Sequence, residues 1–484
     1  METVDVKIPS AASVRAADAY TISSRQITSA ALMYRAALEA SVFAYRYIPP
    51  DARLVFLCGP GNNGGDGLCM ALLLSAFFPV QVVEVAADER RSPDFLHYRA
   101  QLREKGIPCC SYGEWDKSTE GAQVFDCLLG SGLNGAPRGI FEEVIHWLNT
   151  GTAPIWSIDL PSGMQGDNNE HLEHGIVVHA DHTLSFQAPR LSFFFPENEI
   201  FTGHWHVLNI GLDTSRFDAL AYVNTKVERP VVSRFVYKNK LGKTLLVAGS
   251  KAMPGAAVLA AGAALRSGTG YVYALVPEAV QQVISIKYPQ LICHIRESEN
   301  AGLPDLSFAS AIGAGPGLGT GPEALRLLTH ILKETKVPLL LDADALTLMA
   351  QEPALWKYAG RRTVITPHPG EFDRIIGTKH HSGYERWQAQ VAFSKQQGIT
   401  IVLKGAFTSI SSPEGKSWFN TTGTPGMAKA GSGDVLTGLL SGLLAQGMPV
   451  TEAARYAVYH HGRKGEEAAQ TQGLQAMNAG DVLL

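Results

Sequence analysis

Asp434 is the residue whose type and position most clearly suit it to catalysis. It follows the turn Gly431-Ser432-Gly433 and precedes an apolar helical pattern, so we expect a helix to begin near it. The unpaired N–H groups and the positive dipole end of such a helix attract anions, and glycines let a phosphate approach the backbone closely. A carboxylate beside a bound phosphate can take a proton from an attacking hydroxyl. The same residues would also suit an Asp that only caps the helix.

A second glycine-rich loop lies near the start of the chain. The sequence G-P-G-N-N-G-G-D-G, Gly59–Gly67, follows a short apolar strand and precedes a helix predicted over Leu68–Phe77. Strand, glycine loop and helix together can hold a phosphate or dinucleotide at the helix N-terminus. This loop is neither the G-x-G-x-x-G fingerprint nor a P-loop, because no Lys-Ser/Thr follows it. Asn62, Asn63 and Asp66 could bind a ligand or a monovalent cation, and a plain polar turn is the alternative.

The elements around this loop alternate between strand and helix. Val124–Cys127 is a predicted strand that contains Asp126, and Ile155–Ile158 is another, followed by Asp159 and Ser162. Such alternation predicts a parallel sheet whose strands end at one edge. We therefore expect these side chains to meet Asn63 at that edge, although either Asp alone could be structural.

The same pattern starts again after a stretch, Gly211 to Tyr237, in which periodicity fades. We place the boundary there and expect domains at 1–225 and 226–484. The strand ends of the second half are followed by loops rich in Gly, Asp, His or Lys: Gly249–Ala257, Gly313–Gly319, Asp342–Leu346, Pro367–Glu371 and Lys404–Ala406. The predicted fold class is α/β, with two doubly wound, three-layer domains.

Composition excludes several classes of protein. With 484 residues the chain is too long for one ordinary core, and a net charge of −4 favours neither nucleic acid nor an anionic membrane. The first residues contain no apolar signal-peptide block, and the most apolar window, Leu68 to Ala87, is too interrupted to span a bilayer. Six cysteines without a C-x-x-C pair indicate a reduced, cytoplasmic protein.

Three motifs in the first half resemble the epimerase domain of the NAD(P)H-hydrate repair enzymes. They are C-G-P-G-N-N-G-G-D-G, F-D-C-L-L-G-S-G-L and D-L-P-S-G, within residues 10 to 215. The resemblance implies a Rossmann-like domain that interconverts the R and S hydrates of NADH and NADPH, with K+ held by Asn63, Asp126 and Ser162. It implies hydrate contacts at Asn62, Asn63, Gly64, Gly65, Asp66, Gly130, Ser131, Gly132, Leu133, Asn134, Gly135, Ala136 and Asp159. Epimerisation needs transient loss of the hydroxyl or ring opening, which Asp159 or Asp126 could assist. One departure from the family pattern is Arg190, where a lysine is expected.

Six motifs in the second half resemble the nucleotide-dependent NAD(P)H-hydrate dehydratase, which has a ribokinase-like fold. They are M-P-G-A, G-P-G-L-G, D-A-D-A-L, T-P-H-P-G-E, L-K-G-A and G-S-G-D, within residues 234 to 484. The resemblance implies Mg2+ and ADP or ATP, with Asp434 as the base. It implies hydrate contacts at Ala256, Gly317, His368 and Asp434, and nucleotide contacts at Lys404, Gly405, Ala406, Phe407, Thr408, Gly431, Ser432 and Gly433. Departures are Phe407, where Gly is usual, and Lys429, which could alter phosphate contacts.

We therefore expect a bifunctional enzyme of nicotinamide-nucleotide repair. Its first domain epimerises the hydrates, and its second dehydrates the S form at the expense of ADP or ATP, through a phosphorylated hydrate. Its partners are small molecules, and we expect a homo-oligomer. The alternative is a ribokinase-like small-molecule kinase, of the vitamin-precursor type, fused to a non-catalytic binding domain.

Overall fold

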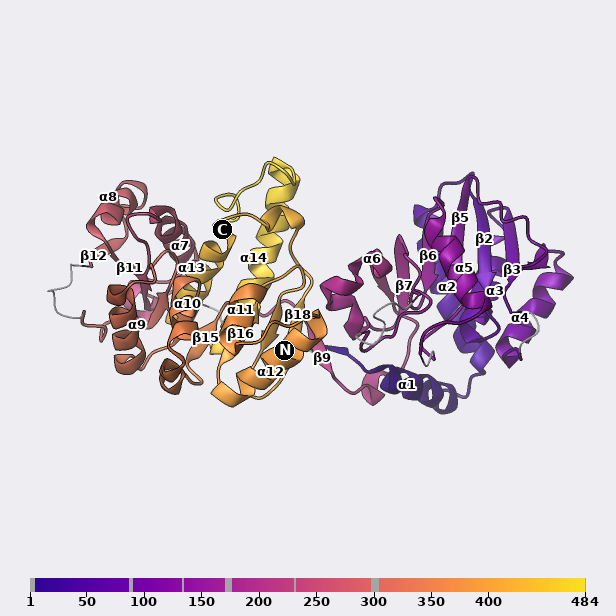
Figure 1. Cartoon of the computed structure of the whole chain (residues 1–484), viewed down its shortest axis with the longest axis horizontal. Helices are drawn as coiled ribbons and strands as arrows, with labels where there is room; N and C mark the ends of the chain where they lie inside the picture. The colour runs from indigo at the N-terminus through magenta and orange to yellow at the C-terminus, as the bar shows by residue number, and fades with distance from the viewer. Residues whose placement is uncertain are drawn as a thin grey trace. The chain divides into compact units, whose positions relative to one another are not determined.

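The computed structural model describes residues 5–86, 90–132, 135–169, 176–229, 232–296 and 304–483 (Figure 1). The chain divides into two compact units. One comprises Lys7–Leu220, and the other comprises Met1–Val6 with Ala221–Leu484. Each unit is an α/β structure built on its own largely parallel sheet, so the predicted fold class is confirmed. In the described part of the chain, no helix has the length and apolar character needed to cross a membrane.

The sheet of the Lys7–Leu220 unit has seven parallel strands in the order β4-β3-β2-β5-β6-β7-β8. The strands are β2 (Arg53–Cys58), β3 (Val80–Glu84), β4 (Cys109–Ser111), β5 (Ala122–Cys127), β6 (Ile155–Ile158), β7 (His182–Phe186) and β8 (His204–Leu208). The strand order reverses direction between β2 and β5. In doubly wound sheets, ligands bind outside the carboxyl ends of the strands at such a switch point.

Helices cover both faces of this sheet. They are α1 (Ala11–Ser24), α2 (Ser29–Tyr47), α3 (Asn62–Leu74) and α4 (Pro93–Glu104) on one face and α5 (Ile140–Thr150) on the other, with a short α6 (Glu199–Thr202) before β8. Successive strand residues point to opposite faces, so Phe56 packs with α1–α4 whereas Val55 and Leu57 pack with α5. The continuous apolar run of β2 is therefore buried on both sides.

The second unit has an eleven-stranded sheet in the order β1-β9-β18-β17-β16-β15-β14-β13-β10-β11-β12. The strands are β1 (Val6–Ile8), β9 (Ala221–Asn224), β10 (Lys243–Val247), β11 (Tyr271–Val276), β12 (Ile292–Ile295), β13 (Ala311–Ala314), β14 (Leu339–Leu341), β15 (Thr363–Ile365), β16 (Thr400–Leu403), β17 (Ser409–Ser411) and β18 (Ser417–Asn420). Strands β10 to β16 are parallel, whereas β17 pairs antiparallel with both β16 and β18. The switch point lies between β10 and β13.

Eight helices of the described chain cover this second sheet. On one face lie α9 (Pro322–Glu334), α10 (Asp344–Gln351), α11 (Pro369–Ile376) and α12 (Gly383–Gln397), and on the other α7 (Pro254–Arg266), α8 (Glu278–Lys287), α13 (Ser432–Ala445) and α14 (Val450–Gln472). Figure 1 shows α13 and α7 side by side in this unit. The closely packed α13 carries the glycine turn that precedes Asp434.

Two short strands, β1 and β9, extend the edge of the second sheet. The sequence analysis does not predict either of them. Next to β1, Asp5 forms an ion pair with Arg455 of α14 at 2.6 Å between Oδ1 and Nη2, and only 4% of the Arg455 side chain is exposed. The first residues of the chain thus extend the sheet that residues 221–420 build.

Two functional helices begin earlier than predicted. Helix α3 starts at Asn62, inside the glycine loop, instead of at Leu68, and α13 starts at Ser432. Close packing explains the glycine at position 64 of this helix, because a Cβ atom there would lie 1.8 Å from the carbonyl oxygen of Gly59. Gly431 precedes α13 with φ +92°, a backbone conformation that favours glycine. Asp434 therefore lies in the first turn of α13, and Asp66 lies within α3, beyond its first turn, and not in a loop.

Candidate active sites

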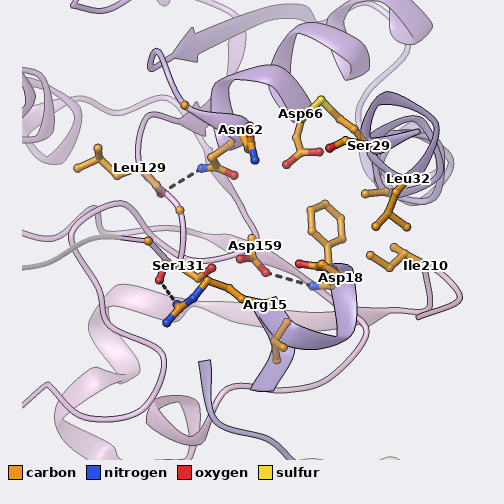
Figure 2. Close-up of a pocket in the computed structure, with 18 of the residues that line it drawn as sticks. Arg15, Asp18, Ser29, Leu32, Asn62, Asp66, Leu129, Ser131, Asp159 and Ile210 are labelled. Atoms are coloured by element: carbon orange, nitrogen blue, oxygen red, sulfur yellow. Dashed lines mark hydrogen bonds between the residues drawn. The ribbon is translucent and has the colours of Figure 1, made fainter. Parts of the chain in front are cut away.

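A cavity of about 740 Å³ lies at the switch point of the seven-stranded sheet (Figure 2). The loops after β2, β5 and β6 and the helices α1 and α2 line it. Of the predicted hydrate contacts, the lining includes Asn62, Asn63, Asp66, Gly130, Ser131, Gly132 and Asp159. Gly64, Gly65, Gly135 and Ala136 are not part of the lining, and Leu133 and Asn134 lie outside the described residues.

Asp126 is completely buried behind the cavity and is not part of its lining. Its carboxylate accepts hydrogen bonds from the Ser157 hydroxyl at 2.7 Å and from the Ser162 backbone N–H and hydroxyl at 2.8 and 2.5 Å. Burial raises the pKa of Asp126, and these donors oppose the rise. The side chain is thus held rigidly beside Ser162 and does not face the cavity.

Asn63 has one satisfied and one unsatisfied polar atom. Its Nδ2 donates to the Leu129 carbonyl at 3.0 Å, while its buried Oδ1 has no hydrogen-bond partner among the described residues. Ser162 Oγ accepts from the Leu129 N–H at 2.9 Å. The structure therefore brings Asn63, Asp126 and Ser162 to one place around residue 129, as the strand pattern predicts. A buried oxygen without a donor indicates a missing partner.

Asp159 is the carboxylate that β6 delivers to the cavity. Its backbone has φ +65°, and its Oδ1 forms an ion pair with Nη2 of Arg190 at 2.6 Å. Arg190, the residue that departs from the family pattern, is only 2% exposed. On the same cavity, the pKa of Asp66 is raised well above its usual value, mainly by burial and then by the Asp159 carboxylate.

Sequence reasoning missed one carboxylate of this cavity. Asp18 of α1 lines the cavity, and its pKa is raised to about 6, first by burial and then by Asp159, while Arg190 opposes the shift. Helix α1 has no glycine loop beside it, and the short strand β1 before it was not predicted. The available signal was that Asp18 is the one acidic residue of α1.

The second site surrounds the N-terminus of α13. Lys404, after β16, donates to Asp342 Oδ1 at 2.9 Å, and Thr437 of α13 donates to Asp342 Oδ2 at 2.7 Å. A Cβ atom on Gly433 would lie 3.4 Å from the Lys404 ammonium, so this cation lies against the glycine turn. Burial raises the pKa of Asp434 to about 6, Asp342 adds to the rise, and Lys404 opposes it.

Other predicted residues of this unit occupy the same strand ends. A Cβ atom on Gly317 would lie 3.2 Å from that of Ala256, so the loops after β10 and β13 meet. Within the predicted nucleotide segment, Thr408 Oγ1 donates to the Gly405 carbonyl at 3.0 Å. His368 caps α11, since its Nδ1 accepts from the Gly370 N–H at 3.1 Å. The His368 ring remains 56% exposed and can still meet a ligand.

Lys429 does not point at the glycine turn. Its ammonium donates to the carbonyls of Gln475 and Met477, both at 2.5 Å. This departure from the family pattern thus anchors the C-terminal segment instead of contacting a phosphate.

Comparisons with known proteins match both units. A family model described as the YjeF-related protein N-terminus matches residues 29–192, and one described as NAD(P)H-hydrate dehydratase matches residues 244–483. The bifunctional NAD(P)H-hydrate repair enzyme of Moorella thermoacetica is 32% identical, over 96% of this chain and 93% of its own length. The enzyme of that name from Escherichia coli K12 is also 32% identical, over 93% and 87%. A solved ADP/ATP-dependent NAD(P)H-hydrate dehydratase from Bacillus subtilis, co-crystallised with ATP and Mg2+, is 31% identical over 54% of this chain and 91% of its own, with a TM-score of 0.45.

Matches of this identity and coverage make the chain a two-domain enzyme with an epimerase domain and a dehydratase domain. It belongs to the family of bifunctional NAD(P)H-hydrate repair enzymes. The predicted resemblance is therefore confirmed, and the small-molecule kinase is not favoured.

Proposed function

We propose that this chain returns both hydrates of NADH and NADPH to the intact cofactor. The Lys7–Leu220 unit interconverts the R and S hydrates, and the second unit dehydrates the S form with ADP or ATP. One observation carries the proposal: Asp434 lies in the first turn of α13, with Lys404 and the Gly431–Gly433 amides beside it. A base, a cation and the Gly431 and Gly433 amides at one helix N-terminus are what phosphoryl transfer to a hydroxyl requires.

In the dehydratase, Asp434 takes the proton of the hydrate's hydroxyl group. The hydroxyl oxygen then bonds to the terminal phosphorus of the nucleotide as that phosphorus separates from its bridging oxygen. The glycine amides and Lys404 stabilise the charge on the transferring group. Phosphate is a far better leaving group than hydroxide. Its loss from one ring carbon, together with a proton from the neighbouring carbon, restores the double bond of NADH or NADPH.

The donor set of this site suits Mg2+ that arrives with the nucleotide. Both Asp342 oxygens are hydrogen-bonded, to Lys404 and Thr437, whereas Asp344 has one oxygen engaged by the Gly319 N–H at 2.8 Å. Asp344 also lies close enough to Asp434 to raise its pKa. Asp344 together with the nucleotide's own phosphates would hold the ion, in keeping with the few protein ligands that Mg2+ usually takes. The ion would neutralise phosphate charge.

In the epimerase, we assign the base to Asp159 and not to Asp126. Asp159 lines the cavity, whereas every oxygen of Asp126 is directed at Ser157, Ser162 or Leu128. Asp159 is fixed by Arg190, so its carboxylate can exchange a proton with the hydrate's hydroxyl from a constant position. Asn62, Asp66 and the Gly130–Gly132 loop surround the same space and would contact the hydrate.

The orphaned Oδ1 of Asn63 supports the proposed K+ site. That oxygen, with Asp126 and Ser162, offers the oxygen ligands that alkali cations take. In the described chain, no three His, Cys, Asp or Glu side chains form a metal-binding group, so this donor set suits K+ better than a transition metal. A bound K+ would stabilise the loops after β2 and β5. The homo-oligomer and the cytoplasmic location stay predictions.

Recovery of NADH tests the proposal. A mixture of R and S hydrates with ADP or ATP, Mg2+ and K+ should regain the full near-ultraviolet absorbance of NADH. Recovery that stops at the S fraction would contradict the epimerase assignment alone. No recovery with either nucleotide would contradict the dehydratase and reinstate the small-molecule kinase.

A further inference from the structure

Helix α1 lies outside the matched epimerase segment, which starts at residue 29, yet it forms one wall of the epimerase cavity. It places Asp18 and Arg15 on the lining. Figure 2 shows Asp18, Asp66 and Asp159 directed into one space. They come from α1, α3 and the end of β6, elements that are distant in sequence. Three carboxyl groups from separate elements repel one another in one cavity, so their convergence points to a functional role.

Asp18 has none of the contacts of a structural carboxylate. In the described chain it accepts no hydrogen bond and caps no helix, since Ser10 caps α1. By contrast, Asp167 and Asp218 anchor the start of α1, because they accept from the Ala11 N–H at 2.9 Å and the Ser10 N–H at 2.8 Å. Asp18 is therefore free to meet a ligand.

The surroundings of Asp18 favour its protonated form. Asp159 and Asp18 repel each other, and Asp66 lies across the cavity, while Arg190 pairs with Asp159. Two nitrogens of Arg190, Nε and Nη1, are buried and have no partner among the described residues. Burial and a neighbouring carboxylate both disfavour the charged form of a carboxyl, so Asp18 can carry the proton that an acid must supply.

We propose that Asp18 is a second catalytic carboxyl of the epimerase, which works with Asp159 on the hydroxyl of the hydrate. This inference rests on the proposed epimerase function.

The reaction balances without any added reagent. The protonated carboxyl of the pair gives its proton to the hydroxyl oxygen, and the carbon–oxygen bond breaks to release water. The lone pair of the ring nitrogen forms a carbon–nitrogen double bond, which leaves the ring cationic. Water then adds to the other face of that carbon and returns a proton to the ionised carboxyl of the pair. Asp18 and Asp159 therefore exchange roles between the two directions of the reaction.

Asp18→Asn in the full chain tests the proposal. Interconversion of R and S hydrates is followed by chromatography without nucleotide, and dehydration of the S hydrate is measured separately. We expect epimerisation to fall by about 10²- to 10⁴-fold, the usual contribution of acid–base catalysis, with dehydration and thermal stability unchanged. Asp18→Glu should restore part of the epimerisation rate. The part of the pH dependence of epimerisation that comes from titration of Asp18 should be absent from Asp18→Asn.

Asp218→Asn is the matched control, because it loosens the anchor of α1 without changing the cavity lining. Equal loss of epimerisation in Asp218→Asn would mean that the position of α1 matters and not the Asp18 carboxyl, and this would overturn the proposal. Epimerisation in Asp18→Asn within threefold of the unmodified chain would also overturn it. Full activity in Asp159→Asn would instead remove the proposed base and leave Asp18 as the sole acid–base group.

Discussion

Removing the Asp5 carboxylate tests how the first residues of the chain support the second unit. Asp5→Ala would leave Arg455, which is 4% exposed, without its closest ion-pair partner at 2.6 Å. Arg455 would keep Glu452 at 3.5 Å and the Asn224 side chain at 3.3 Å, and its guanidinium lies 4.7 Å from the Trp418 ring centre. Breaking a buried ion pair from one side costs about 3–5 kcal/mol. Because Asp5 is 22% exposed and two partners remain, we expect a loss of about 2–3 kcal/mol.

Calorimetry should report this loss in one transition. The transition of the second unit is identified by its upward shift with ADP or ATP, because a ligand stabilises the state that binds it. It should melt about 4–6 °C lower in Asp5→Ala, at about 2 °C per kcal/mol for a unit of this size. The transition of the Lys7–Leu220 unit should not move.

The matched control is Glu228→Ala, which removes an exposed pair with Lys226 at 3.4 Å and should have little effect. Arg455→Met added to Asp5→Ala should recover part of the loss, because the buried charge then disappears. A shift below 1 °C, or an equal shift in Glu228→Ala, would refute the reasoning.

Three further predictions follow from the two sites and the boundary. Asp434→Asn should abolish dehydration and spare epimerisation. In the unmodified chain, the rate of dehydration should decline as the pH falls through about 6, because a protonated Asp434 cannot act as a base. A dehydration rate that stays flat from pH 8 to 5 would contradict this role. Asp126→Ala should remove epimerisation and its K+ stimulation together, and a variant that K+ still stimulates would show that the cation binds elsewhere. A fragment of residues 226–484 lacks β1, β9 and Asp5, so it should melt below the same unit in the full chain, whereas an unchanged melting temperature would make these edge strands dispensable.

The parts of the fold that the sequence predicts are those with strong local signals. Apolar runs ending in glycine, Asp or Lys marked β2, β5, β6 and β16, and the Gly431 turn marked the start of α13 to within two residues. Local signals failed where distant backbone decides the structure. The predicted start of α3 was wrong because the helix begins within the glycine loop, where Gly64 lies against the Gly59 carbonyl and helix propensity gives no signal.

Contacts between residues distant in sequence also explain why β1, β9 and Asp18 were not predicted. Strands β1 and β9 are short, and the sheet order makes neighbours of residues more than 200 positions apart. Asp18 belongs to a helix without a motif, so only the folded cavity shows that it faces Asp159. The choice of Asp159 over Asp126 as the proposed epimerase base required the burial and hydrogen bonds of both side chains, which the spacing of residues in the sequence does not reveal.

The contact between Asp5 and Arg455 also sets an order of events during synthesis. The two residues are 450 positions apart. A ribosome that adds 5–20 residues per second therefore reaches Arg455 about 20–90 s after Asp5. Asp5 must wait for that time without Arg455, while the Lys7–Leu220 unit is already complete on the emerging chain. Nascent chains should therefore acquire epimerisation well before dehydration, and a stalled ribosome would carry only the first of the two activities.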